Sequence, residues 1–238
     1  MIPRIIHYCW FGRGQMPELA LRCIESWHRV MPDYDYKMWN EDNFDINCIA
    51  YVKEAYEARK YAFVSDYVRL FALFSEGGIY MDTDVEVFKP YDDILNLSGF
   101  IGFEGTKYRH IGTGTIASEP EGEWVKEQIS AYNGIHFLQP NGDYDLTTNP
   151  VRISAIMCQN GFLQNGKEQD YRDMHVFPVD YFCPRQTTGE YLKTRNTYCD
   201  HHYMGSWEEN KKSTGIITKV IGQKNLTRLI KLKRLIMG

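Results

Sequence analysis

The sequence predicts an α/β domain, because segments with the composition of strands alternate with amphipathic segments of helical period. The first strand–helix–strand unit consists of an apolar and aromatic strand at 5–10, a helix at 17–31 and a strand at 34–39. Its first strand leads into a glycine-containing loop, which is where α/β proteins place nucleotides. A length of 238 residues is enough for one domain with its own core.

The same alternation continues along the chain. Helices are expected at 46–58, 60–75, 120–132 and 149–160, and strands at 79–81, 85–88, 100–104 and 111–117. Gly77 and Gly78 should end the second helix, and Asn149 is a plausible cap for the last one. A long functional loop is predicted at 133–149, and irregular structure with one or two short strands at 161–195.

Two carboxylates one residue apart, Asp82 and Asp84, interrupt the apolar run between Ile79 and Phe88. Alternation along a strand would place them on the same side. Such close carboxylates repel unless a cation or protons neutralise them, so the pair suits a divalent metal such as Mn²⁺ or Mg²⁺. Solvated acids at a strand end are the alternative, but the apolar flanks and the preceding glycines favour a rigid site.

Three other places carry candidate functional side chains, each with a simpler structural explanation. Asp66 and Arg69 share one face of a helix, either as a surface ion pair or looking into the cleft of the two aspartates. Trp10 follows the first strand and is either a face for a nucleobase or a core residue. The histidines at 201–202 precede Gly-Ser-Trp, and can offer a metal one imidazole or simply lie on the surface.

Composition excludes several classes of protein. The hydrophobic content of 43% and charged content of 24% are those of a folded globular protein. The six cysteines are far apart and lack metal-ligand spacing, so we expect reduced thiols and a cytoplasmic location. No leader peptide is recognisable, no apolar run approaches the roughly 20 residues of a membrane span, and no nucleic-acid-binding module is present.

The carboxyl-terminal segment differs in charge from the rest, because no acidic residue follows Glu209 whereas eight basic ones do. We therefore divide the chain into a main domain at 1–209 and a basic tail at 210–238. From Asn225 the tail has the pattern of a basic amphipathic helix. Contact with an anionic membrane is favoured, and docking onto the acidic body of the chain or onto a partner helix are the alternatives.

Four motifs occur in the order of a known family. They are IPRIIHYCWFG at 2–12, SDYVR at 65–69, GGIYMDTD at 77–84, and the HH and GSW pieces at 201–207. Together they resemble the Asp-x-Asp sugar transferases of glycosyltransferase family 32, which include bacterial capsule and lipopolysaccharide enzymes and yeast mannosyltransferases. The large clostridial glucosylating toxins are more distantly similar. The resemblance implies the GT-A fold, a single α/β domain with a mixed, mainly parallel sheet flanked by helices.

The resemblance also implies roles for individual residues toward a nucleotide-sugar. Trp10 would lie against the nucleobase, Tyr80 near the nucleotide, and Asp66 and Arg69 on the donor sugar. In this reading Asp82 holds ribose or sugar and a metal-bound water.

By the same match, Asp84 binds the metal directly and His202 is a further metal ligand. Ser206 and Trp207 would hold the diphosphate. The tail lies outside the match.

The implied activity is a metal-dependent, retaining hexosyl transfer from a uridine- or guanosine-linked donor. The family suggests a glycan acceptor, such as a lipid-linked oligosaccharide, in bacterial surface-polysaccharide assembly. A phosphatase with an aspartate nucleophile is the main rival, since a strand ending in Asp-x-Asp is also its signature, but its pattern expects Thr or Val at the position of Glu86. A non-catalytic carbohydrate-binding protein or an inactive transferase are further alternatives.

Overall fold

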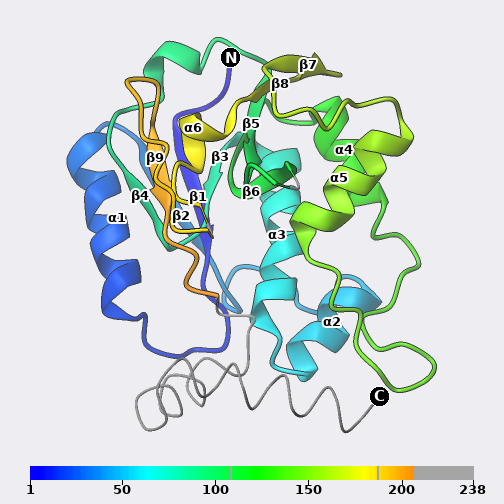
Figure 1. Cartoon of the computed structure of the whole chain (residues 1–238). Coiled ribbons are helices and arrows are strands. Elements are labelled where there is room, and N and C mark those ends of the chain that lie inside the picture. Colours follow the sequence, from blue (N-terminus) through cyan, green and yellow to red (C-terminus); the bar gives the residue numbers. More distant parts are fainter. Residues whose placement is uncertain (108, 187, 206–238) are drawn as a thin grey trace, which may run out of the picture. The chain divides into compact units, whose positions relative to one another are not determined.

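The computed structural model describes residues 1–107, 109–186 and 188–205 (Figure 1), and residues 1–203 form one compact unit. Its centre is a seven-stranded sheet with the strand order β2-β1-β3-β6-β5-β8-β7. These strands are β1 (Ile5–Cys9), β2 (Asp35–Trp39), β3 (Gly78–Met81), β5 (Gly99–Glu104), β6 (His110–Ser118), β7 (Gln169–Tyr171) and β8 (Met174–Phe177). A separate antiparallel pair consists of β4 (Val85–Val87) and β9 (Cys199–His201).

The large sheet is mixed. Strand β1 is parallel to both β2 and β3, and β5 is parallel to β8, whereas β6 and β7 run in the opposite direction. Five of the seven strands therefore point the same way. The predicted α/β class, with the mixed and mainly parallel sheet that a GT-A fold implies, is confirmed.

Helices cover both faces of this sheet (Figure 1). One face packs against α1 (Glu18–Val30) and the short α6 (Val179–Phe182), and Trp27 of α1 is fully buried there. The other face packs against α2 (Ala50–Glu57), α3 (Tyr61–Glu76), α4 (Glu123–Ser130) and α5 (Asn149–Gln159). A 3₁₀ turn, η1 (Asp92–Ile94), lies between β4 and β5. The two hydrophobic cores thus lie on opposite sides of the central strands.

The end of α3 fixes the position of β3, which leads to the two aspartates. Gly77 caps α3 with a φ of 66°, and Gly78 follows with a φ of 96°, both in the left-handed region that glycine tolerates best. A Cβ at Gly78 would lie 2.6 Å from the carbonyl oxygen of Ile5 in β1. Glycine at this position therefore lets the chain reverse sharply and enter the sheet beside β1.

Several expectations need correction in detail. The helices predicted at 46–58 and 120–132 are shorter, since α2 begins at Ala50 and α4 runs from Glu123 to Ser130. Asn149 does not cap α5, because Thr148 takes the N-cap position and the Asn149 side chain is buried. The segment 161–195 contains β7, β8 and α6. The prediction of a long loop at 133–149 is confirmed up to Thr148.

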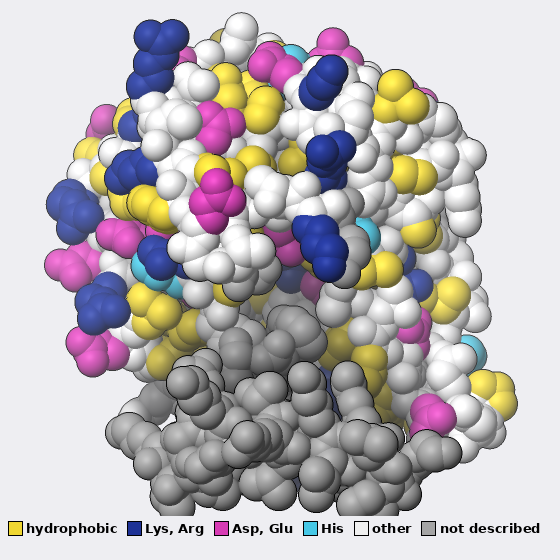
Figure 2. Space-filling model, viewed as in Figure 1, with side chains coloured by type: hydrophobic (Ala, Val, Ile, Leu, Met, Phe, Trp, Pro, Cys, Tyr) yellow, Lys and Arg dark blue, Asp and Glu magenta, His cyan; other side chains and the backbone are white. Residues whose placement is uncertain are grey.

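The predicted boundary at 209 and the tail at 210–238 lie outside the described residues, so both stay predictions. All six cysteines are free thiols. Basic, acidic and hydrophobic side chains are interspersed over the face shown in Figure 2. Within the part of the chain that the structure describes, no helix combines the length and the apolar character needed to cross a bilayer.

Candidate active site

Asp82 and Asp84 lie in a tight turn between β3 and β4, at the carboxyl end of β3. The backbone N–H of Asp82 donates a hydrogen bond to the carbonyl oxygen of Gly114 in β6 at 2.9 Å. The backbone N–H of Val85 closes the turn by donating to the carbonyl oxygen of Asp82 at 3.0 Å. The expectation that both acids follow a buried strand is confirmed, but the strand alternation invoked to align them is wrong, because 82–84 is not extended. The turn itself brings the two carboxylates together.

A histidine completes this group. His201, at the end of β9, places its Nε2 atom 3.2 Å from Oδ1 of Asp84 and 3.9 Å from Oδ2 of Asp82. Its position is set by the β4–β9 ladder, in which His201 pairs with Val85 directly after the turn. Burial lowers the pKa of His201, but the two aspartates outweigh burial and raise the pKa well above its usual value. The two carboxylates thus favour the charged form of this imidazole.

The ligand atoms of Asp82, Asp84 and His201 all lie within 4.8 Å of one another. Two carboxylates and one imidazole on a rigid turn and strand are a suitable donor set for Mn²⁺ or a similar divalent ion. The two carboxylates carry like charges close together, so the site's own electrostatics favour a cation. The residues present thus fit the metal that the sequence predicts.

Arg69 of α3 joins the metal site to the neighbouring helix. Its guanidinium donates to Asp66 at 2.8 Å and to the carbonyl of Thr113 at 2.6 Å, and lies 3.2 Å from Asp82. It also lies over the ring of Tyr80, 4.6 Å from its centroid. Only 5% of the Arg69 side chain is exposed. The explanation of Asp66 and Arg69 as a surface ion pair is therefore wrong, and both belong to the buried wall of the site.

Asp66 is held from the side of α5 as well. The Asn149 amide donates to the Asp66 carbonyl at 3.0 Å and accepts from the Tyr132 hydroxyl at 2.9 Å. Burial raises the pKa of Asp66 to about 6, against the opposing effect of Arg69. Sequence reasoning missed this use of Asn149, because its place before Pro150 resembles a cap.

Tyr80 and Trp10 differ in exposure. Tyr80 is fully buried, and its hydroxyl donates to Oδ1 of Asp82 at 2.8 Å, which orients that carboxylate. Trp10 is half-buried just after β1, and its indole donates to the carbonyl of Gly14 at 2.7 Å. Their predicted contacts with a nucleotide stay predictions.

The side chain of His202 does not contact Asp82 or Asp84. Its Nε2 atom lies 3.0 Å from the Glu86 carboxylate, while the adjacent His201 faces Asp82 and Asp84. The sequence could have separated the two histidines only through the pairing of β9 with β4, which has no local signal. The predicted metal-ligand role of His202 stays a prediction. Ser206 and Trp207, predicted to hold a diphosphate, lie outside the described residues.

Comparison with known proteins agrees with this site. Residues 17–100, which include Asp66, Arg69 and both aspartates, match the family model described as glycosyltransferase sugar-binding region containing DXD motif. Inositol phosphoceramide mannosyltransferase 1 of Schizosaccharomyces pombe is 30% identical over 172 residues, which cover 66% of this chain and 52% of that protein. Glucan organizing enzyme 1 of Cryptococcus neoformans is 34% identical over 150 residues, which cover 60% and 37%.

Among solved structures, a glycosyltransferase involved in the glycosylation of the major capsid of PBCV-1 is 14% identical with a TM-score of 0.47, covering 90% of this chain and 100% of that chain. The chain spans about half or less of the length of the curated relatives it matches. The family match includes the aspartate pair and the helix that supports it. Residues 17–100 therefore match the DXD-containing sugar-binding region of glycosyltransferases, which confirms the resemblance drawn from the sequence.

Proposed function

We propose that this protein transfers a hexose from a UDP- or GDP-linked donor to a glycan acceptor, with a divalent ion held by Asp82 and Asp84. The observation that carries this proposal is the convergence of both carboxylates and the His201 imidazole at the carboxyl end of β3. The DXD family match, which includes both aspartates, supports it.

Such a transfer mainly requires stabilisation of the negative charge on the leaving diphosphate. A divalent ion between the aspartates would supply positive charge to that leaving group. The protein's part is to keep the two carboxylates aligned and ionised, and Arg69 does so for Asp82 through its 3.2 Å ion pair. Tyr80 adds a hydrogen bond to the same carboxylate oxygen.

Asp66 is the residue that we place on the donor sugar, with Arg69 holding its carboxylate. The Arg69 guanidinium is already used by Asp66, Asp82 and the Thr113 carbonyl, so it positions these groups. Trp10, half-buried after β1, offers an indole face for the nucleobase.

We propose retention of the anomeric configuration, through front-side attack of an acceptor hydroxyl that is deprotonated by the departing phosphate. No protein base is then required, and none is assigned. Two relatives are named inositol phosphoceramide mannosyltransferases, which favours mannose as the hexose and a lipid-borne acceptor. Such an acceptor agrees with a role in bacterial surface-polysaccharide synthesis.

We also propose that the enzyme works in the cytoplasm at the inner face of the plasma membrane. The basic residues after Glu209 support this, since each contributes about 1 kcal/mol near an anionic surface. Deleting residues 210–238 should release the protein from anionic vesicles and leave donor hydrolysis unchanged. Equal vesicle binding after the deletion would refute the membrane role.

The transferase proposal is tested by Asp84→Asn, assayed for release of nucleoside diphosphate from UDP- and GDP-hexoses with Mn²⁺. Loss of a carboxylate that carries metal charge should lower the rate at least about hundredfold with the fold intact. Glu86→Gln is the matched control, because Glu86 lies two residues on and contacts His202 instead of the aspartate pair. Full activity of Asp84→Asn would exclude the metal site proposed here.

A further inference from the structure

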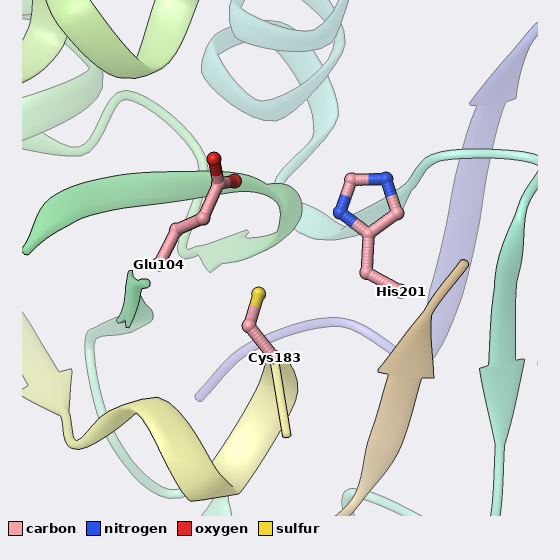
Figure 3. Close-up of side chains that lie close together, drawn as sticks. All are labelled: Glu104, Cys183 and His201. Atoms are coloured by element: carbon pink, nitrogen blue, oxygen red, sulfur yellow. The ribbon is translucent and has the colours of Figure 1, made fainter. Parts of the chain in front are cut away.

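A second group of metal-ligating side chains lies beside the DXD turn. Glu104 at the end of β5, Cys183 directly after α6 and His201 at the end of β9 bring one ligand atom each within 4.8 Å of the others. Figure 3 shows the three side chains directed toward one another, with one ring nitrogen of His201 on the side of Glu104 and Cys183. The DXD chemistry uses neither Glu104 nor Cys183.

Two glycines of β6 leave the space for this group. A Cβ at Gly112 would lie 3.3 Å from the Cys183 sulfur and 3.1 Å from Cβ of Glu104. A Cβ at Gly114 would lie 2.9 Å from Nδ1 of His201. Since residues two apart on a strand share one face, both glycines open the same side of β6. The absence of a side chain at both glycines therefore leaves the space in which the three side chains meet.

The two nitrogens of His201 have different surroundings. Nε2 faces Asp84 at 3.2 Å, whereas Nδ1 is buried and has no hydrogen-bond partner among the described residues. A buried polar atom without a partner is costly and calls for an explanation such as an ion. The Nδ1 atom is thus available to a ligand on the Cys183 side.

We propose that Glu104, Cys183 and Nδ1 of His201 form a binding site for a thiophilic divalent ion, Zn²⁺ above all. Thiolate, imidazole and carboxylate are the ligands that zinc prefers, and three protein ligands leave a fourth position for water. On binding, the Cys183 thiol and the Nδ1 atom of the protonated His201 each lose a proton to solvent. Asp84 then acts as the supporting carboxylate and accepts a hydrogen bond from the Nε2–H group of the bound histidine.

The shared histidine couples this site to the DXD site, a consequence that rests on the proposed function. An imidazole bound to zinc through Nδ1 keeps its remaining proton on Nε2, so Nε2 cannot also bind an ion between Asp82 and Asp84. Zinc at Cys183 and full ligation of the catalytic ion therefore exclude each other. Zn²⁺ should inhibit Mn²⁺-dependent transfer, and Cys183→Ser should relieve that inhibition.

The binding claim is tested without any activity assay, by titrating the metal-stripped full-length protein with Co²⁺. Wild type should develop a thiolate-to-cobalt charge-transfer band that saturates at one equivalent and is bleached by Zn²⁺. The band should disappear in Cys183→Ser and persist in Cys158→Ser, which removes an exposed thiol. It should also persist in Asp82→Asn, so failure of the DXD proposal would not be mistaken for failure of this one.

Absence of the band in wild type, or its persistence in Cys183→Ser, would overturn the proposal. Thermal melting of each metal-free variant shows whether it folds. If Cys183→Ser does not fold, Glu104→Gln decides the matter by competition for Zn²⁺ against a chromophoric chelator. We expect its zinc affinity to fall at least tenfold, and an affinity equal to that of wild type would contradict the assignment.

Discussion

One buried guanidinium connects the carboxylates of the candidate active site. Arg69 contacts Asp66 and Asp82 on opposite branches of its planar group and donates to the Thr113 carbonyl. Such a fork geometry is available to arginine and not to lysine. The residue therefore fixes the spacing between α3 and the DXD turn as well as the charge of the site.

Arg69→Met should destabilise the protein by about 3–5 kcal/mol, because it leaves the buried Asp66 and the half-buried Asp82 without this counter-charge. The measurement is the free energy of unfolding in urea. Arg22→Met is the control: Arg22 also pairs with an acid of its own helix, Glu18 at 3.4 Å, but on the surface. That variant should change stability by no more than about 0.5 kcal/mol. Equal effects of the two substitutions would show that burial of the Arg69 network has no energetic importance.

At the scale of single elements, the junction between α3 and β3 positions the strand that leads to the two aspartates. His7 of β1 lies fully buried at this junction, where its Nε2 atom is 2.8 Å from the Gly77 carbonyl and its Nδ1 accepts from the Trp39 indole at 3.1 Å. This pattern requires the neutral ring with its proton on Nε2. Strands β1 and β2 and the end of α3 are thus joined through one histidine.

Burial lowers the pKa of His7, which gives its contribution to stability a defined pH dependence. Below about 6.5 the unfolded chain binds a proton that the folded chain binds only at lower pH, so this contribution falls as the pH drops. His7→Gln should therefore lose less stability between pH 7 and pH 5 than wild type does, in urea unfolding at several pH values. Identical pH slopes for the two proteins would contradict this explanation.

Gly78 provides a second prediction at the same junction. An alanine there would meet the Ile5 carbonyl at 2.6 Å and would have to adopt a φ of 96°. We expect Gly78→Ala to destabilise the protein by about 1–3 kcal/mol and to impair the DXD site through displacement of β3. Gly14→Ala is the control, because nothing lies within 4 Å of its added Cβ. If both variants unfold at the same urea concentration, the glycine is not required by the fold.

Local sequence signals predicted most of these elements, because strand composition, helical period and glycine stops act over short distances. The β1–α1–β2 unit and the stop at Gly77 are examples. The site was less predictable where it depends on pairing between distant segments. The β4–β9 ladder places His201, and not His202, beside the aspartates. Glu104 and Cys183 come together because the end of β5 lies near the end of α6, and no local sequence pattern indicates this.

At the scale of the whole described unit, the two cores and the sheet between them form a scaffold that presents one set of side chains at the carboxyl end of β3. The catalytic proposal depends on this set binding a metal and a nucleotide together. A panel of nucleoside diphosphates, each with and without Mn²⁺, tests that proposal in a thermal unfolding experiment. Ligand at a hundredfold excess over its Kd stabilises a folded protein by about 2.7 kcal/mol, which is readily measured.

We predict a large rise in melting temperature with UDP or GDP only when Mn²⁺ is present, and loss of that rise in Asp84→Asn. The base that gives the rise would also identify the donor. No shift with any nucleotide, or an equal shift without metal, would contradict the central claim that the DXD turn is a metal-dependent nucleotide-sugar site.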